Sequence, residues 1–432
     1  MFYIEVMFCF LFFTWMIECN MYMIVNFIMM MLVYLIINMG EGFYFSWEDG
    51  LGFSMSSMNY SLILLSCWII YFMMFSMNLS NLLFSVVMFL MLIIMKCFMS
   101  MDLFMFYFFF ESSLVPTFFL VLKWGHNKNS IISSYYMLFY TVFFSLPLLI
   151  MLFMLMNELD ILMFELIDEM ELNLIQLLFI IFGMLVKLPV FLMHVWLPKA
   201  HVEAPVFGSM VLAALMLKLG GYGLISVVLM FKINNYIYEI MIILLCLSSF
   251  YLSMFCLNQV DLKMLIAYSS VVHMGLMCMG IMVFNFIGLI GAQMMMIAHG
   301  LCSSGLFYMV YLFYLRSNSR MLMINKGFLS LSSKMMLMWF LLCSSNFSSP
   351  ISLNLVSEVF LINSVVVWSL MMIIPIMFMS FFSVCYSVYM FIFISHNKGM
   401  NIMCFNDKLM EYFIVFMHWF PLNLLIFNMS FF

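Results

Sequence analysis

Six ionisable side chains lie deep inside long apolar stretches of this sequence. They are Glu111, Lys187, Lys218, His273, His299 and Glu358. A charge at the centre of a bilayer costs about 2.5–3.5 kcal/mol on insertion scales, so each group needs a partner or a hydrated cavity. Structural ion pairs between helices would explain one or two such residues. Six such residues in six different stretches instead favour a row of groups with a shared function.

These residue types share one chemistry, which is holding and releasing protons. A buried lysine changes its proton affinity as a carboxylate partner approaches or retreats. Histidine titrates near neutral pH without assistance and suits a relay between such groups. Six of these groups at similar depth in a helix bundle therefore predict a lateral proton path within the membrane plane, joined by ordered water.

The elements that must position these side chains are membrane helices. The 432 residues are 68% hydrophobic and 8% charged, against about 45–50% and about 25% in soluble domains. Apolar stretches about 20 residues long predict an all-α, polytopic membrane protein rather than a barrel of ten-residue strands. With 14 Lys and Arg against 19 Asp and Glu, no basic patch is available for nucleic acid, which we exclude as a partner.

About fourteen membrane spans are expected, because polar residues interrupt the apolar runs at regular intervals. Their limits are residues 1–17, 21–39, 57–77, 80–95, 101–122, 131–156, 174–198, 206–230, 236–257, 260–283, 286–315, 335–363, 364–395 and 409–430. On this basis the chain divides into N-terminal helices, two repeats and a C-terminal helix, over residues 1–95, 96–230, 231–395 and 396–432.

Two of the spans are expected to be broken. Pro189 removes the hydrogen bond to the Leu185 carbonyl in the seventh span. The twelfth span is interrupted by the polar run that ends at Pro350. Broken helices at corresponding positions of two halves are typical of transporters with inverted repeats. Spans four to eight and nine to thirteen would be two inverted five-helix repeats, each broken in its fourth member.

Cationic residues are distributed unevenly between the two sets of loops. Loops after odd-numbered spans hold ten, namely Lys123, Lys128, Lys199, Lys263, Arg316, Arg320, Lys326, Lys334, Lys398 and Lys408, whereas loops after even-numbered spans hold only Lys96 and Lys232. The positive-inside rule places the odd loops on the cytoplasmic or mitochondrial matrix side and both termini on the opposite side. The acidic segment Glu158–Glu171 then falls outside as a solvated loop.

Other sites and signals are weaker. No secretory or transit signal is expected at the N-terminus, because the first cationic residue is Lys96. His194 and His201 could hold a metal only with difficulty, since two prolines intervene. The eleven Cys are scattered and favour core packing. We expect no site for NADH, a flavin or an iron–sulfur cluster in this chain, because no Gly-rich phosphate loop or ligand cluster occurs.

Several long motifs resemble one family. These are ESSLVP over 111–116, KLP over 187–189, HVWLPKAHVEAP over 194–205, GSMVLAA over 208–214, KLGGYG over 218–223, DLKMLIAYSS over 261–270 with His273, and MIAHGLCSS over 296–304. They are similar to the antiporter-like membrane subunits of respiratory complex I, the mitochondrial NADH:ubiquinone oxidoreductase. The WLPKAHVEAP segment favours the subunit 4 family over its two siblings. The likeness is weak before residue 95 and after residue 365.

The resemblance implies roles for the six residues. Glu111 and Lys187 would be the paired carboxylate and lysine of a first half-channel. Lys218 would lead toward the centre, His273 and His299 would continue the axis, and Glu358 would be the outer station. The sequence departs from the family at Ser357, where glycine usually precedes the glutamate.

The resemblance also implies the surroundings of the chain. It would be a multi-pass protein of the mitochondrial inner membrane, contacting lipids and the neighbouring antiporter-like chains 2 and 5. NADH, FMN, iron–sulfur clusters and ubiquinone would serve the complex in other subunits. Three rivals stay open, namely a stand-alone cation/proton antiporter, a structural spacer and a solute carrier.

Overall fold

The computed structural model describes residues 56–76, 81–125, 129–159, 170–171, 173–191, 193–232, 235–396 and 407–427. The first two expected spans, residues 1–17 and 21–39, lie outside these ranges, as does most of the acidic segment. Over the described residues the α-helices are α3 Ser57–Ser76, α4 Asn81–Met99, α5 Leu103–Ser112, α6 Leu114–Trp124, α7 Ser130–Leu159, α8 Leu174–Lys187, α9 Trp196–Glu203, α10 Val206–Val211, α11 Leu217–Met230, α12 Asn235–Cys256, α13 Leu262–Met282, α14 Phe286–Ser317, α15 Phe328–Leu331, α16 Ser333–Asn346, α17 Leu353–Trp368, α18 Ile373–Ser395 and α19 Leu409–Leu424.

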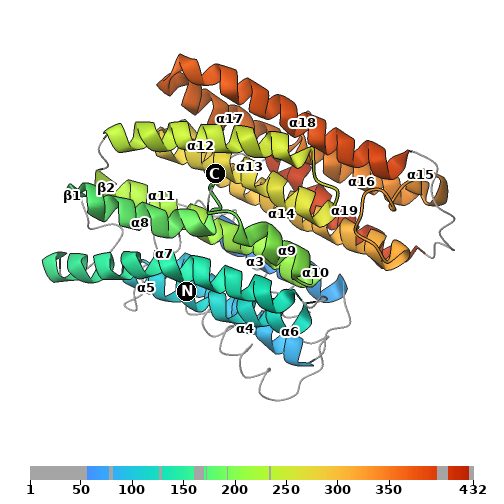
Figure 1. Ribbon diagram of the computed structural model, residues 1–432, viewed down its shortest axis with the longest axis horizontal. Helices are drawn as coiled ribbons and strands as arrows, with labels where there is room; N and C mark the ends of the chain where they lie inside the picture. Colours follow the sequence, from blue (N-terminus) through green and yellow to red (C-terminus); the bar gives the residue numbers. More distant parts are fainter. Residues whose placement is uncertain are drawn as a thin grey trace.

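The helices run along one common direction (Figure 1). Ten helical segments in the described part are long and apolar enough to cross a membrane, and α8 and α17 are shorter apolar helices. The expectation of an all-α polytopic membrane protein is therefore confirmed. The third to fourteenth expected spans all coincide with helices. Short 3-10 turns at Leu370–Met372 and Leu425–Phe427 extend α18 and α19.

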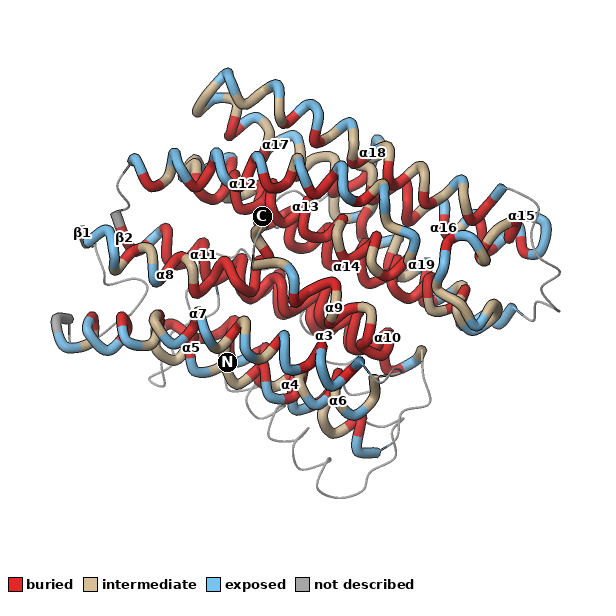
Figure 2. Tube along the Cα trace, viewed as in Figure 1, coloured by how far each residue is buried: buried red, intermediate tan, exposed pale blue. Residues whose placement is uncertain are grey.

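Burial divides the helices into a core and a periphery (Figure 2). The most apolar part of Val206–Met230 is fully buried, although Leu229 near its end is exposed, and α13 and α14 are mostly buried. By contrast α7, α18 and α19 bury a third or less of their most apolar window. A helix that is apolar all round and exposed suits a lipid surface, whereas the buried helices must carry the polar groups.

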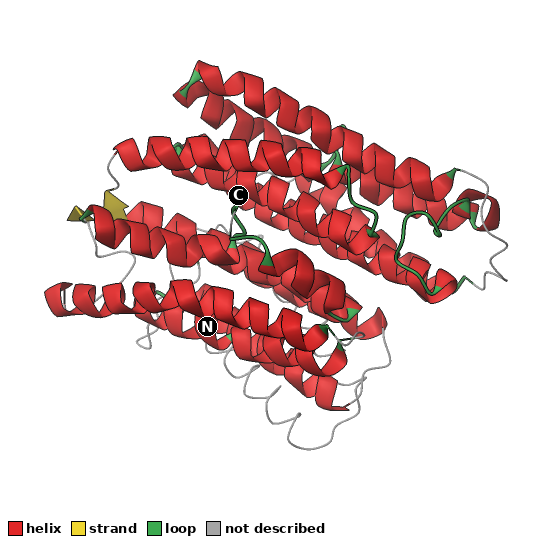
Figure 3. Cartoon of the chain, in the orientation of Figure 1, coloured by secondary structure: helices red, strands yellow, loops and turns green. Residues whose placement is uncertain are grey.

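One end of the bundle is marked by a short strand pair that the sequence did not predict (Figure 3). The strands β1 Met170–Glu171 and β2 Phe231–Lys232 pair in parallel. They join the connection after α7 to the end of α11, and both follow even-numbered spans. We call this the sheet end.

The opposite end gathers the loops after odd-numbered spans, and we call it the cationic end. Arg320 Nη1 donates to the Val202 carbonyl over 2.5 Å, and an isolated bridge pairs Asp261 with Met321. Arg316 Nη2 reaches Asp407 Oδ1 at 2.8 Å. Loops that the charge count assigns to one side of the membrane thus contact each other.

Both expected breaks are present. Helix α8 ends at Lys187, and Leu188 is extended because a residue before proline avoids helical geometry. The indole of Trp196 donates to the Val186 carbonyl over 3.1 Å, which satisfies an acceptor that the ended helix leaves unpaired. In the twelfth span, α16 ends at Asn346 and α17 begins at Leu353.

Two further irregularities were not predicted. A π-helical turn, η1 Leu212–Met216, separates α10 from α11, and such turns free backbone groups and often occur at functional sites. In addition, Ser113 separates α5 from α6. Pro116 explains that second break, since it cannot donate to the carbonyl of Ser112.

Candidate functional site

The first predicted pair meets at the break between α5 and α6. Lys187 is 2% exposed, and its ammonium donates to the Phe110 carbonyl. The ammonium lies 3.2 Å from the centroid of the Phe110 ring and 3.4 Å from Ser113 Oγ. Lys187, the last residue of α8, therefore extends its side chain into the break between α5 and α6.

Glu111 lies one residue beyond the carbonyl that holds Lys187. Its Oε1 is buried and finds no hydrogen-bond partner among the described residues. The carboxylate and the Lys187 ammonium interact electrostatically, yet among the described residues no ion pair joins them directly. Glu111 and Lys187 are thus neighbours, but the Lys187 ammonium donates to the carbonyl of Phe110 and not to the carboxylate.

Lys218 lies at the centre of the bundle and is fully buried. Its Nζ donates to the Ala213 carbonyl over 2.8 Å. That acceptor belongs to the π-helical turn η1, so the local widening of the helix supplies a partner for the ammonium. The same nitrogen lies 3.0 Å from His299 Nδ1 on α14. The two contacts compensate part of the cost of burying a cation in an apolar core.

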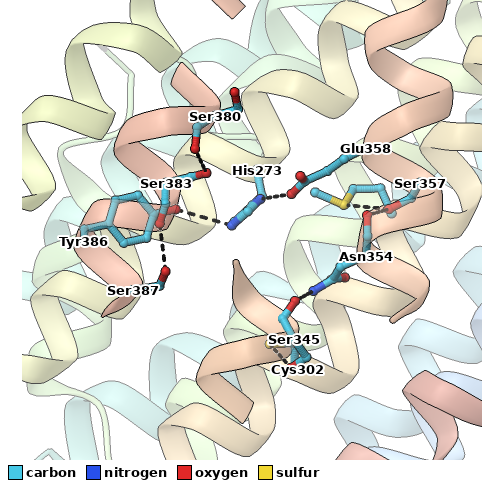
Figure 4. Close-up of polar contacts among 11 residues, drawn as sticks. His273, Cys302, Ser345, Asn354, Ser357, Glu358, Ser380, Ser383, Tyr386 and Ser387 are labelled. Carbon is cyan, nitrogen blue, oxygen red and sulfur yellow. Dashed lines mark hydrogen bonds and ion pairs between the residues drawn. The ribbon is translucent and has the colours of Figure 1, made fainter. Parts of the chain in front are cut away.

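The row continues from α14 through α13 to α17. The rings of His299 and His273 lie 5.8 Å apart between centroids, and His273 Nδ1 lies 3.3 Å from Glu358 Oε1. Figure 4 shows that His273 also faces Tyr386 on α18, whose hydroxyl lies 3.3 Å from Nε2. Both nitrogens of His273 therefore have a protic neighbour.

Four of the six predicted residues thus form one connected row, in the order Lys218, His299, His273 and Glu358. Glu111 and Lys187 form a separate group beside it. Helices α8 and α11 pack closely where the two groups of residues meet. A Cβ at Gly220 on α11 would lie 3.3 Å from the Cβ of Lys187 on α8, so the glycine permits this close approach. Each group in the row can take up a proton, and adjacent groups stand close enough for transfer directly or through one water molecule.

Glu358 keeps its place despite the serine that precedes it. Ser357 Oγ donates to the Asn354 carbonyl over 2.8 Å and lies 3.2 Å from Met295 Sδ. The hydroxyl is therefore satisfied within its own helix and against α14. Glu358 is 14% exposed, so it is the member of this ion pair nearer to the surface.

The sequence also matches known proteins. Residues 100–383 match the family model described as NADH:quinone oxidoreductase/Mrp antiporter, TM. A relative from Ceratitis capitata named NADH-ubiquinone oxidoreductase chain 4 is 43% identical over 95% of this chain and 93% of its own length. One of the same name from Aedes aegypti is 46% identical over 75% and 74%. The chain belongs to the NADH-ubiquinone oxidoreductase chain 4 family.

Solved structures show the same fold. A chain of respiratory complex I from Thermus thermophilus with bound NADH superposes with a TM-score of 0.88, at 18% identity, over 97% of this chain and 93% of that one. A chain of the Mrp complex from Dietzia superposes with a TM-score of 0.77, at 18% identity, over 88% of this chain and 44% of that one. The fold of this chain therefore also occurs in chains of these two complexes.

Sequence reasoning missed Tyr386. A tyrosine in an apolar helix carries no charge and is one of 21 in the sequence, so composition alone does not single it out. A weaker signal was available, because four of the hydroxyl residues of α18 lie close together over two neighbouring turns of the helix. They are Ser380, Ser383, Tyr386 and Ser387.

Proposed function

We propose that this chain is a proton-translocating membrane-arm subunit of mitochondrial complex I, coupled to electron transfer from NADH to ubiquinone in other subunits. The observation that carries the proposal is the unbroken row of Lys218, His299, His273 and Glu358 inside a lipid-facing bundle. Isolated ion pairs would not require two histidines between a lysine and a glutamate. A solute carrier would need a polar pocket rather than a line of proton carriers.

The proposed mechanism is coupled electrostatics. A change of charge in a neighbouring subunit shifts the interaction between Glu111 and Lys187. Lys187 then passes its proton toward Lys218, and the proton moves through His299 and His273 to Glu358, which releases it. Moving one charge through 100 mV requires about 2.3 kcal/mol. A change of two to three units in the pKa of a buried group supplies about 2.7–4 kcal/mol.

The proposed topology has fourteen spans in two inverted five-helix repeats, within residues 96–230 and 231–395, with N-terminal helices over 1–95 and a C-terminal helix over 396–432. Breaks at α8–α9 and α16–α17 support this arrangement, since they fall at corresponding positions. The cationic end would face the matrix, and both termini would lie in the intermembrane space. The loop contacts at each end of the bundle support the assignment of sides.

The proposed location is the mitochondrial inner membrane. The partners would be the neighbouring antiporter-like chains 2 and 5 together with membrane lipids. This chain would hold no redox centre, no NADH site and no cofactor of its own. FMN, iron–sulfur clusters and ubiquinone would act in other subunits, and the large exposed apolar faces of α7 and α18 are available for protein or lipid contacts.

The test uses the assembled complex in membrane vesicles. Lys218→Met and Glu358→Gln each interrupt the row, and we expect coupled proton pumping to fall about tenfold or more while assembly is retained. Lys334→Met, which changes an exposed lysine at the cationic end, is the control and should pump normally. Unchanged pumping in both row variants would favour a structural spacer. Sodium-dependent exchange without NADH oxidation would favour a stand-alone antiporter.

A further inference from the structure

Each of the two broken spans is bridged by a side-chain donor from its second half. In the first break, the Trp196 indole donates to the Val186 carbonyl over 3.1 Å. In the second break, Asn354 Nδ2 donates to the Ser345 carbonyl over 2.6 Å (Figure 4). All four of these residues are buried. We call these two hydrogen bonds the bridging bonds.

The two bridging bonds occupy corresponding positions in the two breaks. The acceptor is in both cases the penultimate residue of the first half-helix, since α8 ends at Lys187 and α16 ends at Asn346. The donor is the first residue of α9 in one break and the second residue of α17 in the other. Donor and acceptor are separated by 10 residues in the first break and by 9 in the second. This agreement indicates one device used twice rather than two unrelated contacts.

The bridging bonds replace what the breaks remove. The last carbonyls of a helix have no donor within that helix, and a buried carbonyl without a donor is costly. In the second break the backbone is also strained, because Ser348 and Ile351 have φ angles of 59° and 67°. Non-glycine residues keep such angles only where the surrounding contacts hold them, above all a β-branched residue such as isoleucine. The bond from Asn354 to Ser345 closes this strained loop at its base.

The first bridging bond acts on the backbone of Lys187. The Val186 carbonyl and the Lys187 N–H belong to one rigid peptide plane, so a donor that fixes the carbonyl also fixes the start of the lysine side chain. From there the Lys187 ammonium reaches the Phe110 carbonyl and lies 3.4 Å from Ser113 Oγ. Trp196 therefore acts on the position of Lys187 through the backbone.

The second bridging bond fixes the first turn of α17. Asn354 lies four residues before Glu358, and residues at that spacing share one face of a helix. On the other side of the bond, Ser345 Oγ lies 3.2 Å from Cys302 Sγ on α14. The bond therefore ties α17 to α14 through the end of α16. This connection holds the turn from which Glu358 reaches His273 at 3.3 Å.

We infer that Trp196 and Asn354 are positioning residues of the two broken helices, which hold Lys187 and Glu358 in the contacts described above. Neither residue takes up a proton itself. A half-helix that loses its bridging bond can tilt or rotate at the break, and a small misplacement of a reacting group costs a large factor in rate. The inference rests on the proposed function, because it names what keeps two of the proposed proton carriers in place.

The test removes each donor while keeping the shape of its side chain. Trp196→Phe keeps an aromatic ring and removes the indole N–H, and Asn354→Leu replaces the amide by an apolar group of similar size. In the assembled complex in membrane vesicles, we expect proton pumping per NADH oxidised to fall about tenfold in the first variant and about threefold in the second. The second effect is smaller because the Ser345 carbonyl keeps a backbone bond of 3.3 Å from Ser348.

Both variants have a matched control on α16. Trp339 is fully buried, and its indole nitrogen has no hydrogen-bond partner among the described residues. Asn346 is 3% exposed, and its amide nitrogen likewise has no partner within the described part of the chain. Trp339→Phe and Asn346→Leu therefore remove the same kind of donor without removing a bridging bond, and both should pump normally.

Double variants separate positioning from a general role in folding. Trp196→Phe is combined with Lys187→Met, and Asn354→Leu is combined with Glu358→Gln. Each double variant should pump as well as Lys187→Met or Glu358→Gln alone, because the group to be positioned is already gone. A further fall by the factor seen in the single variant would make both residues general structural contacts and overturn the inference.

The inference and the proposed function fail in different ways. Normal pumping in Trp196→Phe and Asn354→Leu, alongside reduced pumping in Glu358→Gln, overturns the positioning role and leaves the proposed function standing. An equal loss in the two control variants also overturns the positioning role. Normal pumping in Glu358→Gln as well would overturn both. A native gel reports assembly, and should Trp196→Phe fail to assemble, Asn354→Leu and its double variant decide the question.

Discussion

Tyr386 gives His273 a second partner, and its hydroxyl can be removed without changing the shape of the core. In Tyr386→Phe the ring stays, but His273 Nε2 loses the contact at 3.3 Å. A buried polar atom left without a partner costs about 1–3 kcal/mol. We expect severalfold slower coupled turnover and an altered pH profile, measured as NADH oxidation in coupled vesicles.

The matched control for that variant is Tyr389→Phe on the same helix. Tyr389 packs against Phe393 with ring centroids 4.4 Å apart, and its hydroxyl makes no hydrogen bond within the described part of the chain. The Tyr389→Phe variant should leave both the rate of NADH oxidation and its pH profile unchanged. A Tyr386→Phe enzyme whose pH profile matches the wild type would show that the hydroxyl only fills space.

At this scale the sequence was informative where a residue type was out of place. Charged side chains in apolar spans are rare enough to single out Glu111, Lys187 and Lys218. Their partners were hidden for a physical reason. The Phe110 and Ala213 carbonyls are backbone atoms whose availability depends on a local break, and no side-chain pattern announces it. The order of His299 before His273 also needed the packing of α13 on α14.

At the scale of elements, helix breaks position the charges. Pro189 ends α8 at Lys187 and lets the ammonium reach the gap between α5 and α6. Pro189→Ala restores a backbone donor, so α8 can continue and carry Lys187 away from Phe110. We expect coupled pumping to fall while assembly persists, measured with an internal pH dye.

A second proline provides the comparison. Pro147 lies inside α7, which continues past it, and α7 carries none of the six residues. Pro147→Ala should therefore pump normally and should stabilise α7. Equal loss of pumping in both proline variants would mean that proline removal disturbs the bundle in general.

Sequence reasoning found the break at Pro189, but it missed Ser113 and the π-helical turn, because apolar residues of ordinary helix propensity occupy η1.

At the scale of the whole molecule, an ion-pair cluster ties the last described helix to the bundle. Arg316 in the final turn of α14 bonds Asp407 Oδ1 at 2.8 Å and Glu411 Oε2 at 2.7 Å. Tyr412 donates to the other oxygen of Asp407. Arg316→Ala leaves two carboxylates without their shared cation. Breaking a buried pair costs about 3–5 kcal/mol, and the partial exposure of these groups reduces that to about 1–3 kcal/mol.

This cluster lies at the cationic end and away from the row. We therefore expect its loss to lower the stability of the complex without changing proton pumping. We expect Arg316→Ala to lower the thermal stability of the detergent-solubilised complex, and to make that stability less dependent on salt, because the screened interaction is gone. Pumping per NADH in the surviving complex should match the wild type. Lys334→Ala, at an exposed lysine near the same end, should change neither quantity. Intact stability with reduced pumping would instead place Arg316 on a proton path, and the cluster would no longer be a tether between α14 and α19.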